Sequence, residues 1–467
     1  RGLPAVCGGG GLRLGLCQRS YNVTGAAVRQ RMMGSKAYVR SSMNHPSFVL
    51  PLMLLATLLV ALLVVIYNSE LHDNSAWNVV SKICWKNATV RPPILVVMVI
   101  CGWGWVVKVC RSASLNLDFV LGGKLQPVSW TYHAALVLFC VLLGTHLVHF
   151  IASEVPGVTW RPWLRCNLFL HGAFFVLLAL PMQTFYAASR LSLLRTLFDS
   201  VVAPLAPVTF WHVIVADYMT SLAKAFSDMQ LSACVASAII SRSRSDADRY
   251  VRSTDLWEGN YSTCSSSVAN ALMLAAPFWW RLMQCLKVYS VTREQKNLWN
   301  ALKYSTAFPL VYFGYVRKLA PSPHHDHLFI AAAVVQSTYC FIWDVHMDWG
   351  LLRRDRSSPI GVSLRELLLV TPQKSVYYAL CVFNLSLRFA WALSIFGGVR
   401  GRGAGMFFFE FIEIIRRHVW AVFRIEWEVV VKVYSSSYSS HPLSSPIADE
   451  DGSEETQPLD SNQEFED

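Results

Sequence analysis

Residues 405–425, GMFFFEFIEIIRRHVWAVFRI, combine the length and apolar character of a membrane span with five charged side chains. These are Glu410, Glu413, Arg416, Arg417 and Arg424. Positions 410, 413, 417 and 424 are spaced by three, four and seven residues, so a helix would align them on one face. A charge at the bilayer centre costs about 2.5–3.5 kcal/mol. We therefore predict that these side chains face a polar cavity, as in a transport or ligand site.

Apolar runs of similar length recur along the chain, which is 54% hydrophobic and only 15% charged. This composition excludes an ordinary soluble domain and predicts an all-α polytopic membrane protein with about ten transmembrane helices. The predicted spans are roughly 47–67, 93–110, 131–151, 167–186, 207–240, 267–288, 301–317, 327–349, 367–397 and 405–431. The fifth is too long for one straight crossing.

Charge along the chain predicts its orientation and its regions. The net charge is +11, although the last nineteen residues carry nine acids and no Lys or Arg. Loops rich in Lys and Arg usually stay in the cytosol. The basic segment before the first span is therefore predicted to be cytosolic, and the even number of spans puts the C-terminus on the same side. The predicted regions are a basic disordered segment 1–46, a four-helix membrane region 47–200, a six-helix core 201–432 and an acidic disordered tail 433–467. Without a compact basic domain, no nucleic-acid binding is expected.

Two N-glycosylation patterns, at Asn87 and Asn260, fall in predicted lumenal loops and agree with this orientation. The twelve cysteines are scattered, with no CxxC pair and no zinc-like spacing. We interpret them as small apolar residues, with one lumenal disulfide pair, and expect no metal or other cofactor.

Further charged residues recur inside the later spans. The cations of this set are Arg281, Lys303, Arg388, Arg416 and Arg417, and the acids are Asp217, Asp344, Asp348 and Glu413. If half of them faced lipid, the cost of about 10–15 kcal/mol would rival the stability of a whole protein. They should therefore face each other or water.

The chemistry of this set favours a small oxyanion as ligand. Arginine forks match phosphate or carboxylate oxygens. Interleaved acids can pair with the arginines when the site is empty, so that the anion is released again. Two alternatives remain for individual pairs: Arg416 and Arg417 could anchor a span end, and Asp344 and Asp348 could cap a helix.

Two other functions remain open. Asp344 and Asp348 could hold a divalent cation in a membrane enzyme acting on phospho-substrates. The tail, residues 435–467, could instead retain glycosyltransferases in a Golgi scaffold.

Six segments carry a family resemblance. They are FWHVIVADYMTSL, PFWWRLMQCL, NALKYSTAF, FIWDVHMDWGL, LRFAW and EIIRRHVWAVFRIEWE, in this order between about residues 210 and 428. They resemble the EXS domain of the phosphate-exporter family, which includes a retrovirus receptor, plant phosphate exporters and a yeast Golgi protein. The first four spans resemble that family only in hydropathy and position.

The resemblance implies a phosphate pathway through the last six helices, without covalent chemistry. The five cations would contact phosphate, Asp217, Asp344 and Asp348 would help to bind it, and Glu413 and Trp391 would line or gate the path. Thr220 would also bind, although many members have Asn at this position. Inorganic phosphate and membrane lipid are the implied partners, and a homodimer and Golgi glycosyltransferases are further expectations.

Many members of that family carry a cytosolic SPX sensor before the first span. Only 46 residues precede the first predicted span here, so we expect a member without SPX. Members of this kind resemble the yeast Golgi protein, which implies return of lumenal phosphate to the cytosol. Export across the plasma membrane is the alternative setting.

Overall fold

A computed structural model describes residues 91–122, 135–142, 144, 187–245, 260–354, 362–393 and 404–439. The predicted spans 47–67 and 167–186, most of span 131–151, Asn87 and nearly all of the two terminal segments lie outside these residues. The described part is mostly helical, as predicted.

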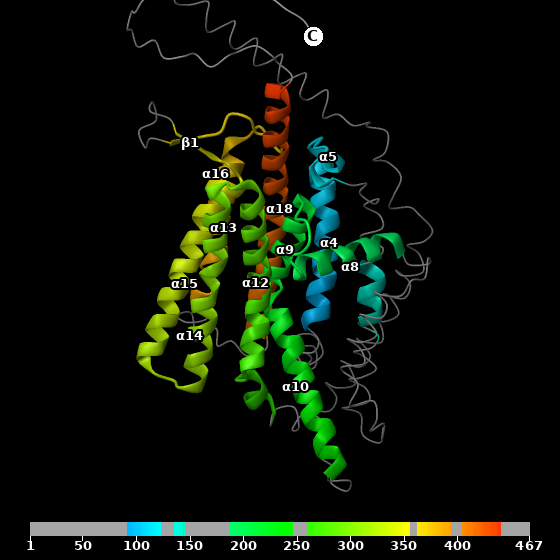
Figure 1. Ribbon diagram of the computed structural model, residues 1–467, viewed down its shortest axis with the longest axis vertical. Coiled ribbons are helices and arrows are strands. Elements are labelled where there is room, and N and C mark those ends of the chain that lie inside the picture. Colours follow the sequence, from blue (N-terminus) through cyan, green and yellow to red (C-terminus); the bar gives the residue numbers. More distant parts are fainter. Residues whose placement is uncertain are drawn as a thin grey trace, which may run out of the picture.

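The elements follow one another as helices with a single small hairpin (Figure 1). They are α4 (Arg91–Ser112), α5 (Leu117–Leu121), α8 (Ala187–Val201), α9 (Phe210–Ser221), α10 (Ala223–Ser245), α12 (Val268–Thr292), α13 (Gln295–Ser305), α14 (Ala307–Leu319), α15 (Pro323–Trp343), the π-helical turn η5 (Asp344–Asp348), β1 (Leu352–Arg354), β2 (Val362–Leu364), α16 (Lys374–Arg388) and α18 (Ala404–Ser439).

Among the described residues, two helical stretches, Arg91–Ser112 and Pro323–Asp348, are long and apolar enough to cross a membrane. Large apolar side chains are exposed on other helices as well, for example Trp279 on α12, Tyr312 on α14 and Val382 on α16. An apolar exterior of this extent is typical of a surface that faces lipid.

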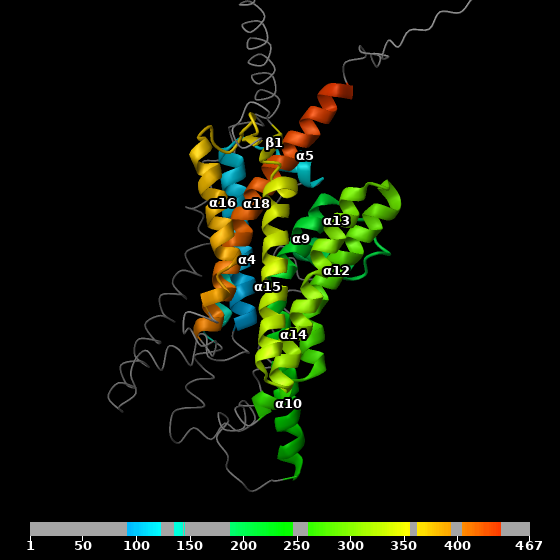
Figure 2. The same cartoon turned by 90° about the vertical axis from the view of Figure 1, so that its left-hand side faces the viewer.

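Helix α18 contacts α4, α9, α16 and η5. In Figure 1 it lies between α4 and α15, and in Figure 2 it runs obliquely across the bundle, from its orange start at the lower left to its red end at the upper right. Its apolar side chains join the largest core cluster, in which Trp349 and Trp420 are fully buried. Gly102 lets α4 approach α18 closely, because a Cβ there would lie 2.0 Å from His418 Nε2.

Two predicted spans are each interrupted within the bundle. The fifth divides into α9 and α10 at Leu222, and the seventh into α13 and α14 at Thr306. The Thr220 hydroxyl donates to Asp217 O at 2.8 Å, and the Thr306 hydroxyl donates to Lys303 O at 2.6 Å. Such hydroxyls compete with the regular helix bonds. Pro309 adds to the second break, because its ring excludes a continuous helix through residue 305.

The eighth and ninth predicted spans also differ from regular helices. The eighth ends in η5, where Trp349 N donates to Asp344 O at 2.9 Å. The ninth was predicted over 367–397, but its helix α16 begins at Lys374 and ends at Arg388. The predicted start was too early, because residues 365–373 form a turn that binds α18.

That turn is held by Glu426 of α18, which is fully buried. Its carboxylate accepts hydrogen bonds from the backbone N–H groups of Leu369 and Val370, from the Tyr377 hydroxyl and from Arg365. The preceding residues form the antiparallel hairpin β1–β2, with Arg353 opposite Ser363. The hairpin is a small addition to the predicted all-α fold.

A disulfide joins Cys234 of α10 to Cys264, just before α12. It confirms the expectation of one cysteine pair. Among the other described cysteines, Cys110, Cys140, Cys285 and Cys340 are buried. Asn260 lies in the described part beside this bond, and its glycosylation stays a prediction.

Candidate functional site

One group of side chains surrounds α18. These side chains come from the breaks between α9 and α10, between α13 and α14 and between α15 and η5, and from the end of α16. We call this group the central cluster. Its members are Asp217, Thr220, Ser221, Arg281, Lys303, Tyr304, Asp344, Asp348, Asn384, Arg388, Glu413, Arg416, Arg417 and Trp420. It contains every predicted binding residue. Discontinuous helices at midmembrane depth are typical of transporter binding sites.

The first part of the central cluster joins α9, α12 and α13. Asp217 accepts a hydrogen bond from Arg281 Nε at 2.8 Å and another from the Tyr304 hydroxyl at 2.6 Å. Arg281 also donates to Gln284 at 2.7 Å and to the Tyr304 hydroxyl at 3.0 Å. All of these side chains are buried. Their pairing removes most of the cost of burying the two charges.

The second part surrounds Asp348 at the end of η5. Lys303 Nζ lies 3.8 Å from Asp348 Oδ2, and the indole N–H groups of Trp343 and Trp420 each donate to this carboxylate at 3.2 Å. Lys303 Nζ also lies over the rings of Tyr304, at 4.4 Å, and Trp343, at 5.2 Å. Aromatic faces stabilise a desolvated cation. Lys303 thus lies against two aromatic rings and beside a carboxylate that is beyond hydrogen-bond distance.

The third part surrounds Asp344 at the start of η5. Arg388 NH2 lies 2.7 Å from Asp344 Oδ2, Asn384 donates to the same oxygen at 3.0 Å, and Arg416 NH1 lies 3.5 Å away. Asp344 is also the C-cap residue of α15, in agreement with the alternative that it caps a helix. Its carboxylate nevertheless bonds to α16 and α18 and not to its own helix, so capping is not its main role.

The fourth part lies on α18 against α9. Glu413 forms a two-point pair with Arg416, at 2.8 and 2.6 Å, and accepts the Ser221 hydroxyl at 2.7 Å. Arg417 donates to Ser221 at 2.8 Å and to Thr220 at 3.3 Å, and its guanidinium lies 4.6 Å from the Trp420 ring centroid. Both arginines are buried, with exposures of 1% and 6%. This burial rules out the alternative that they anchor a span end at the membrane surface.

Trp391, predicted to gate the path, lies beside the central cluster. Its indole N–H donates to the Ser337 hydroxyl at 3.0 Å, and Ser337 donates to the backbone oxygen of Arg388 at 3.0 Å. The tryptophan therefore acts on the site through the end of α16. Its gating role stays a prediction.

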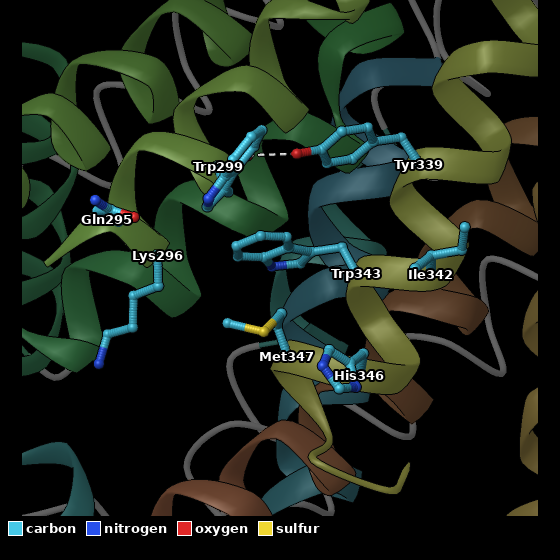
Figure 3. A pocket seen from close by; sticks show the side chains of 8 residues that line it. All are labelled: Gln295, Lys296, Trp299, Tyr339, Ile342, Trp343, His346 and Met347. Atoms are coloured by element: carbon cyan, nitrogen blue, oxygen red, sulfur yellow. Dashed lines mark hydrogen bonds between the residues drawn. The ribbon is translucent and has the colours of Figure 1, made fainter. Parts of the chain in front are cut away.

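A pocket of about 420 Å³ adjoins the central cluster behind Trp343 (Figure 3). The rings of Trp343 and Tyr339 form one wall, and Trp299 faces them from α13, with the Tyr339 hydroxyl donating to Trp299 O at 3.0 Å. Lys296 lines the pocket from the same helix. Because the Trp343 N–H bonds to Asp348, this ring lies between the pocket and the Asp348 carboxylate.

The charges of the central cluster do not cancel. The predicted set contains five cations and four acids, which leaves one positive charge in excess. Each of the four acids has a cation within 4.0 Å. This confirms that the charged residues face each other. Sequence reasoning missed Tyr304, Trp343 and Trp420, which take part through single polar atoms on apolar side chains. Their only signal was position: each lies within a quoted motif, with Tyr304 and Trp343 next to a charged residue and Trp420 three residues after Arg417.

The position of the excess positive charge favours an anion. Arg388 is 16% exposed at its side chain and Glu413 is 32% exposed, whereas the arginines between them are buried. A ligand could therefore enter at this exposed edge and exchange with the carboxylates for the guanidinium donors. Arginine forks bind planar or tetrahedral oxyanions through paired N–H groups.

Residues 87–430 match the profile of the EXS family, described as "EXS family". The chain belongs to the EXS family. All members of the central cluster lie within the matched range. EXS proteins are integral membrane proteins, and this one shares their apolar helical build.

The chain is similar to several curated relatives. The chain is 32% identical over 346 residues to a xenotropic and polytropic retrovirus receptor 1 homolog of Xenopus laevis, covering 70% of this chain and 47% of the relative. Mouse solute carrier family 53 member 1 is 31% identical over 70% of this chain and 47% of its own length. The SPX and EXS domain-containing protein 1 of Dictyostelium discoideum is 26% identical over 87% of this chain and 43% of the relative. The chain thus spans about half the length of the curated relatives it matches.

Proposed function

We propose that this EXS protein transports inorganic phosphate across a membrane, through a path lined by the central cluster. The observation that carries the proposal is the excess of buried cations at the point where several helices are interrupted. The names of the relatives, which include solute carriers, support transport over catalysis. The full proposed architecture is about ten transmembrane helices, with the last six forming the transport core.

In the proposed mechanism, phosphate and the acidic side chains compete for the same arginines. In the empty site Glu413 forms an ion pair with Arg416, and Asp344 forms one with Arg388. An arriving phosphate would take over donors from these pairs while the carboxylates rotate away. When phosphate leaves, the carboxylates pair again, so no buried cation remains without a partner. The affinity for phosphate is therefore high enough for selective binding and low enough for release.

Arg417 is the best single residue for testing this path. Its two donors contact hydroxyls of Ser221 and Thr220, and Glu413 is 4.0 Å away. It therefore has the least committed guanidinium of the three arginines on α16 and α18 in this cluster. A phosphate oxygen can displace these neutral hydroxyls, because it carries the negative charge that they lack and can accept paired N–H groups from the guanidinium fork.

The proposed setting is the Golgi membrane, with net movement from lumen to cytosol along the phosphate gradient. Plasma-membrane export is the other setting consistent with the same site. Homodimerisation and tail-mediated binding of glycosyltransferases stay predictions. A metal-dependent enzyme finds less support, because Asp344 and Asp348 bond to different cations and do not converge.

The test is flux of radiolabelled phosphate into proteoliposomes, with sulfate as competitor. Wild type should show saturable, phosphate-selective flux. Arg417→Ala should reduce it by about tenfold or more, because a charge-assisted hydrogen bond contributes roughly 1.5–3 kcal/mol. Arg317→Ala is the matched control, since Arg317 is a partly exposed arginine at the end of α14 that pairs with Asp326.

Arg417→Lys separates charge from geometry. It keeps the positive charge but loses the fork, so flux should fall between wild type and the alanine variant. Equal flux in wild type and Arg417→Ala would refute the assignment of the site. No flux in well-folded wild type would refute transport, and deletion of residues 435–467 would then test the scaffold function.

A further inference from the structure

A second buried charged group lies one helical turn before the central cluster along α18. It consists of Arg91 at the start of α4, Lys224 and Asp228 on α10, and Glu410 on α18. We call it the lower group, because α4 begins and α10 extends toward the bottom of Figure 1, whereas α18 ends at the top. By the predicted orientation this is the lumenal side.

The two carboxylates of the lower group share their cations unequally. Arg91 NH2 lies 2.7 Å from Asp228 Oδ2, and Lys224 pairs with the other oxygen of Asp228. Glu410 Oε1 lies 3.8 Å from Arg91 NH1, too far for a hydrogen bond. Asp228 thus holds both cations closely, and Glu410 is left with a distant one.

Glu410 also lacks hydrogen-bond donors. Within the described residues neither of its carboxylate oxygens accepts a hydrogen bond, although the residue is only 7% exposed. Apolar side chains of Leu95, Ala225 and Ile414 pack together at the same crossing of α4, α10 and α18. A buried carboxylate without donors is costly as an anion and inexpensive as a neutral acid. In membrane proteins such acids commonly mark proton pathways.

We propose that Glu410 is a proton-binding site that couples the pH on the predicted lumenal side to anion binding in the central cluster. This inference rests on the proposed phosphate transport. The step is the transfer of one proton from water to the Glu410 carboxylate, giving a neutral carboxylic acid that can donate to the adjacent Asp228. The side chain of Lys224 is 29% exposed, so the lower group reaches the protein surface at this residue.

The coupling follows from charge and distance. With Glu410 ionised, Arg91 and Lys224 are balanced by Asp228 and Glu410. Protonation leaves the lower group with one positive charge. Glu410 and Glu413 are three residues apart on α18, about 4.5 Å along the axis. The added charge therefore attracts an anion to the central cluster, and by linkage a bound anion favours the proton equally.

Other charged groups near Glu410 do not reverse this sign. Lys318 of α14 lies close enough to interact electrostatically with Lys224 and Asp228, and its ammonium group donates to Ser265 O at 3.5 Å. On α18 itself, Glu413 and Arg417 are paired with each other or with α9. Arg91 is the nearest charge from α4. In the proposed scheme Glu410 is the group that takes up the proton.

The test uses full-length protein in proteoliposomes with equal pH on both sides. The phosphate concentration for half-maximal flux is measured at pH 5.5 and pH 7.5. Inorganic phosphate itself takes up a proton between these two pH values, but this contribution is common to all variants and cancels in the ratio to wild type. Wild type should bind phosphate about fivefold more tightly at the lower pH, beyond the contribution of the substrate.

Glu410→Gln imitates the protonated acid. It should keep the tight half-saturation value at both pH values, whereas the control Asp326→Asn, an exposed acid on α15, should follow wild type. If Glu410→Gln retains the full wild-type pH dependence, the inference is wrong. If wild type shows no saturable phosphate flux at either pH, the proposed function fails instead.

A second variant keeps the proposal testable if Glu410→Gln does not fold. Asp228→Asn frees Arg91 and Lys224 for Glu410, so the ionised form of Glu410 becomes more favourable. The midpoint of the pH dependence should therefore move to lower pH by about one unit. An unchanged midpoint in a folded Asp228→Asn protein would overturn the inference.

Discussion

Arg281 Nε lies 2.8 Å from Asp217 Oδ1, and the two side chains are only 3% and 2% exposed. The pair joins α12 to the end of α9, where the fifth predicted span is interrupted. Because Tyr304 donates to the same carboxylate oxygen, α13 is fixed to the same point. One buried ion pair thus holds together three of the helices that form the central cluster.

Asp217→Asn should lower the stability of the protein by about 3–5 kcal/mol, because Arg281 is left as a buried charge without a counterion. Adding Arg281→Met should recover part of this loss, since the unpaired charge is then removed. The measurement is thermal unfolding in detergent for the two single variants and the double variant. Strictly additive losses would contradict the pairing.

Asp344→Asn should strengthen phosphate binding and slow its release. The substitution removes the carboxylate that occupies Arg388 and approaches Arg416 in the empty site. Both the half-saturating phosphate concentration and the maximal flux should therefore fall, by about fivefold or more. A concentration series of flux checks this, with Asp326→Asn as control. A rise in the half-saturating concentration would show that Asp344 binds phosphate through a protonated oxygen.

Gly102→Ala should weaken the packing of α4 on α18. The added methyl group would overlap the imidazole ring of His418, so this side chain or one of the two helices must shift. Overpacking of this kind costs about 1–3 kcal/mol. His418→Ala makes room and should relieve most of the effect, although it removes the group 2.7 Å from the Tyr218 hydroxyl. Thermal unfolding of the three variants measures the coupling, and its absence would contradict the close approach.

Cys264→Ser should destabilise the connection between α10 and α12 by about 2–4 kcal/mol, because the bond closes a loop of 30 residues. Cys234→Ser should have the same effect, and the double variant should be no worse than either. Labelling with a maleimide before and after reduction detects the bond directly. The buried Cys285 provides the control, since Cys285→Ser breaks no bond.

Much of the helical order was predictable because span-length apolar runs have a clear period and clear ends. The predicted spans 93–110, 267–288 and 405–431 correspond to α4, α12 and α18. Helix α18 continues to Ser439, so the predicted start of the disordered tail at residue 433 was too early. The breaks at Leu222 and Thr306 were not predicted. They depend on hydroxyls that bond to backbone oxygens and on Pro309, signals too weak to override a continuous apolar pattern.

The site was predicted as a set of residues but not as a geometry. Charge inside an apolar span is rare enough to identify Asp217, Arg281 and Arg417 without any structure. The partners of each charge could not be assigned, because several acids could pair with several cations. Tyr304 escaped notice because tyrosine is common in membrane helices and only its hydroxyl takes part.

The sequence by itself determined that this is a helical membrane protein of the EXS family with buried charges in its later helices, because the cost of placing charge in lipid is independent of detailed packing. The tertiary structure alone decided that Asp344 and Asp348 bond to different cations, and that Glu410 lacks close donors while Asp228 has two. Those pairings depend on distances of a few ångströms between helices far apart in the chain. Local sequence patterns do not encode such distances.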